Sequence, residues 1–206
     1  CKIMITMVKT SPEAEPFKQQ SQILVPIDTP GVEIVGPMHV FGHDDAPHGH
    51  MHIKFTNVRV PEENILWGEG KGFEISQVRL GPGRIHHCMR VIGMAERALE
   101  LGLEYAKIRE QFGKPIASFQ MVQSKLAEIY IELEPARAFG HRALAACVGL
   151  PKGAGGRGQI HKLTAAACLY AGEAFNKAVT EACHIHGGSG YMHDTEINRL
   201  YRANKL

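Results

Sequence analysis

The chain has 206 residues, of which 44% are hydrophobic and 21% charged, and this balance excludes a disordered, collagenous or coiled-coil chain. A net charge of +2 does not point to nucleic acid, and no uncharged apolar stretch approaches the ~18 residues of a membrane span. We therefore expect no nucleic-acid partner and no integral membrane protein. Five cysteines without a C-x-x-C pair exclude a disulfide framework or zinc knuckle. Four of them lie in apolar helical contexts and are expected to be reduced core thiols in a cytosolic type of compartment, namely Cys88, Cys147, Cys168 and Cys183.

The distribution of charge changes near residue 68. Residues 1–68 carry 5 Lys and Arg against 8 Asp and Glu, a balance of −3, whereas residues 69–206 carry 18 against 13, a balance of +5. The secondary-structure pattern changes at the same place, as described next. We therefore expect two domains, over residues 1–68 and 69–206.

The acidic part has the pattern of short β-strands. Residues 2–9, 21–26, 32–35 and 50–55 are rich in β-branched and apolar side chains, and prolines occupy the gaps between them. Residues 29–31 have the composition of a turn. This spacing predicts a small antiparallel sheet or part of a barrel.

The basic part has the pattern of long helices. Apolar residues recur at steps of three and four over residues 85–106, 122–147 and 160–185, which places one apolar stripe on each helix. A fourth helix is expected to begin near Thr195 and to be cut off at Leu206. The many Ala and Gly residues on these stripes suit close packing, so the pattern predicts an antiparallel bundle.

Two glycine-rich segments are expected to connect these elements. Residues 149–158 predict a loop between the second and third helices. Residues 68–72 (GEGKG) lack the register of a phosphate-binding Walker loop, and we interpret them as a flexible connection between sheet and bundle.

Residues 39–52 contain five histidines, three of which alternate as they would on one face of a strand. These histidines are His39, His43, His48, His50 and His52. A metal site is one interpretation of this cluster. A polar, solvated strand face is the other, and it is preferred because no distant pair of ligands has a recognisable spacing.

Two segments could face an anion, and a third carries cations that have an ordinary structural explanation. Residues 81–87 are expected to open the first long helix, which would place Arg84 near a helix N-terminus. Arg109 and Lys114 follow that helix, although its C-terminal dipole would explain both cations. Residues 187–190 form a glycine-rich turn that could approach a phosphate closely or could only end a helix. No spacing joins Ser, His and Asp, or Cys and His, into a catalytic set.

Five motifs, taken together and in this order, resemble the acyl-CoA dehydrogenase family over nearly the whole chain. They are TPG (29–31), VRVP with the later GEGKGF (58–73), REQFGKPIASFQ (109–120), HIHGGSG (184–190) and YRANKL (201–206). Residues 80–90 resemble the branch whose eukaryotic members can be fused to a kinase-like domain. The resemblance implies an α+β fold, in which part of a middle β-domain precedes an antiparallel up-down helical bundle.

The resemblance also implies a reaction. A carboxylate would remove the α proton of an acyl-CoA thioester, the β hydride would pass to FAD, and a trans-2-enoyl-CoA would result. An electron-transferring flavoprotein would then reoxidise the flavin. The family further implies a homodimer or homotetramer whose FAD sites are shared between subunits.

The motifs assign residues to these roles. The cofactor-binding residues would be Arg109, Gln111, Phe112, Gln120, His184, Ile185, His186, Gly187 and Gly188. The residues along the acyl-CoA path would be Gly81, Pro82, Gly83 and Arg84. His184 departs from the usual Gln of the family. No residue of this chain is assigned as the catalytic base or as a metal ligand.

The catalytic carboxylate of the family is expected to lie beyond Leu206. The chain is accordingly expected to be an internal piece of a dehydrogenase, inactive alone. An acyl-CoA oxidase-like flavoprotein and a non-catalytic helical scaffold are the alternatives. The expected compartment is the cytoplasm of a bacterium, or the mitochondrial or peroxisomal matrix of a eukaryote.

Overall fold

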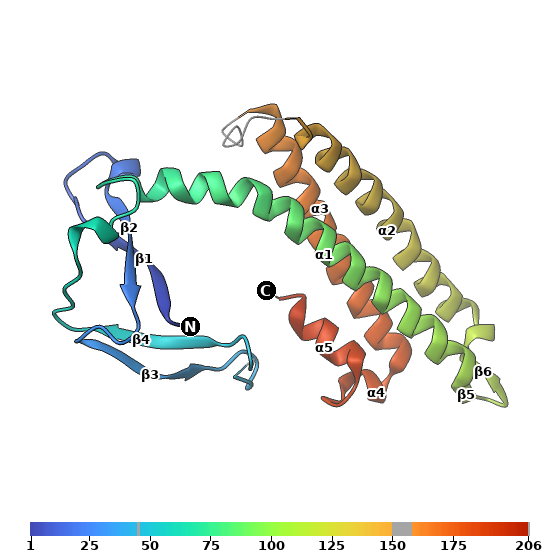
Figure 1. Cartoon of the computed structure of the whole chain (residues 1–206). Helices are drawn as coiled ribbons and strands as arrows, with labels where there is room; N and C mark the ends of the chain where they lie inside the picture. The colour runs from blue at the N-terminus through green and yellow to red at the C-terminus, as the bar shows by residue number, and fades with distance from the viewer. Residues whose placement is uncertain (45, 150–157, 206) are drawn as a thin grey trace. The chain divides into compact units, whose positions relative to one another are not determined.

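A computed structural model of the chain describes residues 1–44, 46–149 and 158–205. The chain divides into two compact units, Cys1–Arg79 and Leu80–Leu206. The first consists of β-strands followed by the start of a long helix, and the second is helical (Figure 1). The expected order of strands and then helices is thus confirmed.

The first unit contains two antiparallel pairs of strands. Strand β1 (Ile3–Lys9) pairs with β2 (Gln20–Pro26), and β3 (Val32–Met38) pairs with β4 (His50–Phe55). A bulge shifts the second register between Ile34 and Gly36. Short 3-10 turns occur at Pro16–Lys18 (η1) and Glu62–Asn64 (η2). The four predicted strands are present, and within the described residues they form two separate pairs.

The glycine-rich residues 68–72 are held against β2. The Gly70 N–H donates to Ser21 Oγ (2.9 Å), and this hydroxyl, fully buried, shares a second hydrogen bond with Thr10 Oγ1 (2.7 Å). A Cβ on Gly72 would lie 2.8 Å from the Gln20 carbonyl oxygen. The expectation of a flexible connection is therefore wrong, because glycine here allows the backbone to approach a strand closely.

Helix α1 (Gly72–Ile108) begins earlier than expected and contains Pro82. Its first turn is anchored by Gln22, whose Nε2 donates to Ser76 Oγ (2.9 Å), and by Phe17, whose ring lies 4.6 Å from that of Phe73. These contacts start the helix before the proline, which removes only one backbone hydrogen bond. The prediction that residues 81–87 open the helix is thus wrong, and Arg84 does not lie near a helix N-terminus.

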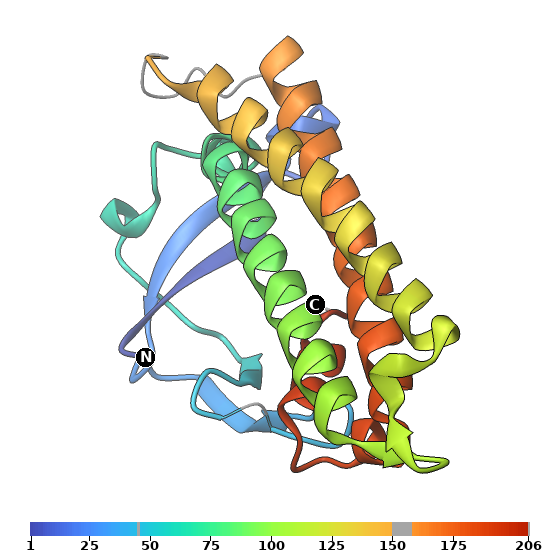
Figure 2. The same ribbon diagram turned by 90° about the vertical axis from the view of Figure 1, so that its right-hand side faces the viewer.

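In its described residues, the second unit contains the rest of α1, two further long helices and two short ones. These are α2 (Gln120–Cys147), α3 (Gln159–His186), α4 (Gly188–Tyr191) and α5 (Glu196–Ala203). Strands β5 (Glu110–Gln111) and β6 (Lys114–Pro115) form a small hairpin between α1 and α2, followed by a 3-10 turn, η3 (Ile116–Ser118). The three long helices lie side by side in both views (Figures 1 and 2). The predicted bundle is confirmed, and its fourth helix begins with a Thr195 cap.

Small and medium side chains form the core of the bundle. Phe175, Val179 and Ile129 are among its fully buried members. Gly140 on α2 is essential to this packing, because a Cβ there would lie 3.1 Å from Ile92 and 3.2 Å from Cys88 Sγ on α1. The Ala and Gly stripes therefore let the helices approach closely, as predicted.

All five cysteines are free. Cys88 is fully buried, as expected for a core thiol, whereas Cys147, Cys168 and Cys183 are only partly buried. Burial raises the pKa of Cys88, and it raises that of Cys183 to about 11. Both thiols are therefore protonated and unreactive at neutral pH.

The predicted loop at residues 149–158 lies largely outside the described residues, which resume at Gly158. In the part of the chain that the structure describes, no helix combines the length and apolar character needed to cross a membrane.

Candidate functional site

A groove of about 1060 Å³ lies at one end of the helical unit. It is bounded by the end of α1, the β5–β6 hairpin, the start of α2 and the segment from the end of α3 into α4. Its lining consists of Tyr105, Arg109, Gln111, Phe112, Ile116, Ser118, Phe119, Gln120, Met121, Val122, Lys125, His184, Ile185, His186, Gly187, Gly188, Ser189 and Met192. All nine residues predicted to bind a cofactor belong to this lining.

One wall of the groove is a tight hairpin. Phe112 and Gly113 connect β5 to β6 with φ values of 55° and 77°, as in the two-residue turns that match the twist of hairpin strands. The turn leaves Phe112 94% exposed at the edge of the groove. Its ring meets that of Phe119 edge to face, with centroids 6.1 Å apart.

Arg109 joins α1 to this hairpin. Its N–H donates to the Tyr105 carbonyl (2.9 Å), and its carbonyl accepts from the N–H of Ile116 (2.8 Å). The backbone of Arg109 is thus held on both sides, whereas its exposed guanidinium has no ion-pair partner among the described residues. A planar cation held in this way is suited to bind a diphosphate.

Another wall is the turn that ends α3. Gly187 has a φ of 56°, and its N–H donates to the His184 carbonyl (3.1 Å). Gly190 follows on α4, where a Cβ would lie only 2.5 Å from the Cys183 carbonyl oxygen. Glycines therefore allow the chain to reverse beside the groove.

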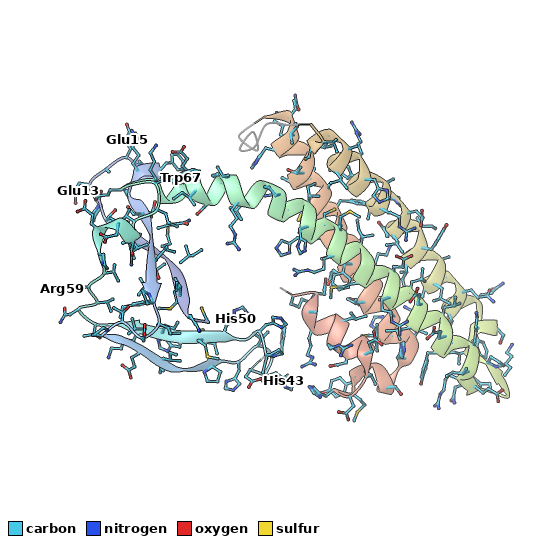
Figure 3. The ribbon with its side chains drawn as sticks, viewed as in Figure 1. Glu13, Glu15, His43, His50, Arg59 and Trp67 are labelled. Atoms are coloured by element: carbon cyan, nitrogen blue, oxygen red, sulfur yellow. The ribbon has the colours of Figure 1, made fainter. Side chains whose placement is uncertain are left out.

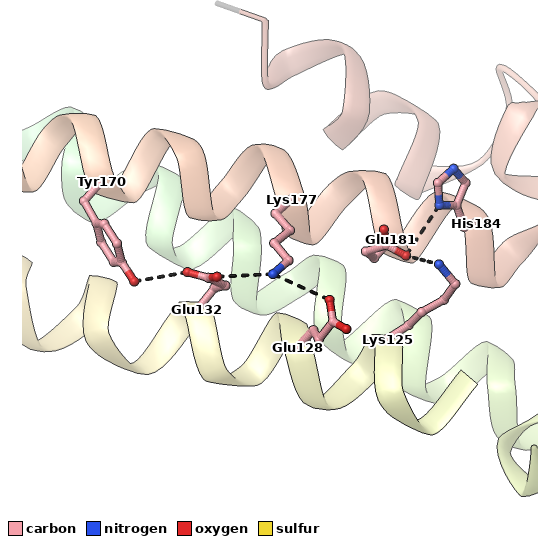
Figure 4. Close-up of polar contacts among 7 residues, drawn as sticks. All are labelled: Lys125, Glu128, Glu132, Tyr170, Lys177, Glu181 and His184. Atoms are coloured by element: carbon pink, nitrogen blue, oxygen red, sulfur yellow. Dashed lines mark hydrogen bonds and ion pairs between the residues drawn. The ribbon is translucent and has the colours of Figure 1, made fainter. Parts of the chain in front are cut away.

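The described lining residues include two permanent cations and no carboxylate. Lys125 forms an ion pair with Glu181, which also contacts His184 Nδ1 at 3.4 Å (Figure 4). Burial tends to raise the pKa of Glu181, but the hydrogen bonds from Lys125 and His184 outweigh it and leave the pKa lowered. Lys125 is thus neutralised, and among the described residues Arg109 is the cation of the groove without an ion-pair partner.

This donor set fits the predicted cofactor. Arg109 supplies a guanidinium, Gln111 and Gln120 supply side-chain amides, and Gly187–Gly188 expose a backbone without side chains. Phenylalanine and methionine side chains supply flat or apolar surface. Such a groove matches an anionic diphosphate that carries a planar ring, as FAD does.

Two lining residues with chemical significance, Tyr105 and Lys125, were not predicted. Tyr105 lies near the end of α1 and precedes Arg109 by four residues, and the hydrogen bond from the Arg109 N–H to the Tyr105 carbonyl continues the helical spacing that places both side chains on one side. That spacing could have identified Tyr105. Lys125 has no comparable signal, because any surface helix carries lysines.

The four residues predicted along the acyl-CoA path do not line this groove. Arg84 lines a separate depression of about 530 Å³, together with Cys168, Asn176 and Lys205 among others. Its Nη1 lies 3.1 Å from His161 Nδ1. Gly81, Pro82 and Gly83 lie within α1 and are not part of either lining.

The described residues of the histidine segment form no assembled metal site of His, Cys, Asp and Glu side chains. His50 and His52 are exposed on β4, and His43 lies in the connection that precedes it (Figure 3). Over residues 1–44, 46–149 and 158–205, no group of three or more His, Cys, Asp or Glu side chains is placed to hold a metal ion.

Residues 70–206 match the family described as acyl-CoA dehydrogenase, C-terminal domain. FadE2 of Mycobacterium tuberculosis, named a probable acyl-CoA dehydrogenase, is 44% identical over 98% of this chain and 48% of its own length. Acyl-CoA dehydrogenase family member 11 of Mus musculus is 42% identical over 98% of this chain and 25% of its own.

The structure of butyryl-CoA dehydrogenase from Megasphaera elsdenii is also similar. It superposes with a TM-score of 0.81 and 31% identity, covering 99% of this chain and 51% of that one. The chain therefore spans about half, or less, of the length of these relatives.

Proposed function

Because the chain belongs to the acyl-CoA dehydrogenase family, we propose that it is part of an FAD-dependent enzyme that converts acyl-CoA thioesters to trans-2-enoyl-CoA. The groove at the end of the bundle is its FAD-binding region. The observation that carries this proposal is the convergence of all nine predicted cofactor residues, from three helices and a hairpin, on one lining.

Each wall of the groove has a separate role in this proposal. When bound, FAD supplies the hydride acceptor for the reaction. Arg109 holds the diphosphate, and Gln111 and Gln120 donate hydrogen bonds beside it. The glycine turn at residues 187–188 lets the backbone approach the same ligand. Phe112 covers one edge of the site and excludes water.

We propose that the acyl-CoA substrate binds outside this groove. Arg84, which lines the second depression, is the residue that we assign to the substrate path. The catalytic carboxylate is proposed to belong to a part of the whole protein outside this chain. An electron-transferring flavoprotein is the proposed acceptor, and a homodimer or homotetramer is the proposed assembly.

The role of Arg109 is tested by replacing it. The dissociation constant for FAD, measured by flavin fluorescence on the intact protein, is expected to rise about 10- to 100-fold in Arg109→Ala, because a charge-assisted contact to the diphosphate is lost. Arg109→Lys keeps the charge but not the planar fork. Its dissociation constant for FAD should therefore lie between those of the unsubstituted protein and of Arg109→Ala.

Arg142→Ala is the matched control, because Arg142 is exposed on α2 outside the groove. Unchanged FAD affinity in Arg109→Ala would refute the assignment. Two alternatives remain distinguishable by the same preparation. Peroxide release on substrate addition would favour an acyl-CoA oxidase, and a protein that binds no flavin would favour a non-catalytic scaffold.

A further inference from the structure

Two histidines of the strand unit lie on one exposed face of β4. His50 and His52 are separated by Met51, and both are exposed. Successive side chains of a strand project from opposite faces, so the two imidazoles share one face and Met51 lies on the other. Among the described residues neither ring forms a hydrogen bond or an ion pair. The ring nitrogens of both histidines are therefore available to a ligand from solution.

The register of the hairpin places a sulfur atom on the same face. Met38 of β3 lies directly opposite His50, and Gly36 lies directly opposite His52. The bulge in β3 lies before Gly36, so this part of the ladder is regular. Directly opposed residues of an antiparallel pair project from the same face, with Cβ atoms about 4.5–5.5 Å apart. The Met38 thioether is therefore beside the two imidazoles.

The space between these three side chains is open. Met38 is 55% exposed. No atom lies within 4 Å of the point that a Cβ on Gly36 would occupy. The position on β3 opposite His52 thus holds no side chain that could fill the space beside the imidazole.

The chemistry of this donor set favours a soft cation. Among the described residues no group of three His, Cys, Asp or Glu side chains is placed to hold a metal ion, so a divalent ion would find no carboxylate or thiolate to complete its ligands here. Methionine enlarges the set of donors. Thioether sulfur selects Cu(I) among the metals that imidazole also binds. Two imidazoles and a thioether are all uncharged, which suits a monovalent ion.

We propose that His50, His52 and Met38 bind a Cu(I) ion on the exposed face of the β3–β4 hairpin (His50 is labelled in Figure 3). The histidines contribute to the affinity for several metals, and the methionine makes the site selective for Cu(I). All three residues belong to the strand unit, and none lines the groove of the helical unit. The inference is therefore independent of the proposed function.

The test measures the dissociation constants for Cu(I) and for Zn(II) on the intact protein. Cu(I) is titrated without oxygen against a chromophoric chelator, after alkylation of the accessible thiols, because a thiolate would compete for Cu(I). Met38→Leu removes the sulfur and keeps an apolar side chain. Its dissociation constant for Cu(I) should rise at least about tenfold, since even an outer-shell partner of a metal is worth about 10–100-fold in affinity. Its weaker binding of Zn(II) should be unchanged, whereas His50→Gln should weaken the binding of both ions.

Met51→Leu is the matched control, because it removes a sulfur from the same strand but from the opposite face. It should leave Cu(I) binding unchanged. In NMR spectra of the protein labelled with ¹³C at the methionine methyl groups, Cu(I) should shift the Met38 resonance and leave that of Met51 in place.

Three results would overturn the inference. The first is an unsubstituted protein that shifts no Met38 resonance on addition of Cu(I). The second is an equal loss of Cu(I) affinity in Met38→Leu and Met51→Leu. The third is a parallel loss of Cu(I) and Zn(II) affinity in Met38→Leu, which would mean that Met38 supports the hairpin and does not bind the metal.

Discussion

Gly190 has no room for a side chain. A Cβ at this position would lie 2.5 Å from the backbone oxygen of Cys183, and backbone yields less readily than the end of a side chain. Gly172, in the middle of α3, has no atom within 4 Å of the equivalent point. Close packing thus requires glycine at residue 190, whereas it does not require glycine at residue 172.

We expect Gly190→Ala to lower the free energy of unfolding by about 1–3 kcal/mol, because the added methyl forces α4 away from α3. Gly172→Ala should instead raise it by about 1 kcal/mol, because alanine favours the helix and meets no obstacle. Urea denaturation followed by circular dichroism measures both changes. A destabilisation of equal size in the two variants would contradict the assigned difference.

The residues that converge on the groove were predicted because they lie in two short segments, 109–120 and 184–188, whose motifs resemble those of the family. The contact between the rings of Tyr105 and His186 could not be predicted from the sequence. Their stacking depends on how α1 and α3 are placed side by side, and helix periodicity does not determine that placement. Arg84 illustrates the same limit, since its expected position followed from an incorrect helix start.

At the scale of elements, α2 and α3 are joined by a row of polar contacts (Figure 4). Glu132 accepts hydrogen bonds from Lys177 (3.2 Å) and from the Tyr170 hydroxyl (3.1 Å), and Lys177 also lies 3.5 Å from Glu128. The hydrogen bonds from Lys177 and Tyr170 lower the pKa of Glu132 below its ordinary value of 4.5. The row therefore depends on an ionised carboxylate.

This dependence predicts how stability varies with pH. A carboxyl whose pKa is lower in the folded chain stabilises the fold above its ordinary pKa, and the contribution is lost as pH falls through the folded value. The urea midpoint should thus decrease below about pH 5, and Glu132→Gln should reduce the slope of that decrease. The midpoint is measured at closely spaced pH values.

Glu173→Gln is the control for this experiment. Glu173 lies on the same helix as Lys177, is exposed and has no ion-pair partner among the described residues. If its replacement flattened the pH dependence as much as Glu132→Gln, the row of contacts would not be the cause.

The start of helix α1 could not be predicted from the sequence pattern. Its apolar stripe over residues 85–106 was evident, but its first turns carry no clear stripe and precede a Gly-Pro-Gly sequence that normally marks a boundary. Contacts from Gln22 and Phe17 start the helix there. Such contacts join residues far apart in the sequence and leave no local signal.

At the scale of the whole molecule, the two units differ in how much apolar surface they bury. The helical unit encloses a continuous core. In the strand unit, the alternate residues Ile3, Ile5 and Met7 of β1 are 55%, 64% and 46% exposed and share one face. Exposed apolar strand faces favour association.

We expect the 206-residue chain to associate as its concentration rises, and Ile5→Lys to shift it toward smaller species because a charge resists burial in the contact. Sedimentation velocity at several concentrations measures this. Thr56→Lys adds the same charge at another exposed position of the unit and should have little effect. A monodisperse monomer at all concentrations would contradict the expectation.

The turn at Phe112 has a consequence for the balance between folding and function. A non-glycine residue with φ near 55° is strained by about 1–2 kcal/mol, and this phenylalanine recovers little by packing because it is 94% exposed. Folding alone would favour glycine here. The free chain is thus less stable than it would be with glycine at residue 112, and a bound ligand or a neighbouring subunit that covers the ring would offset the difference.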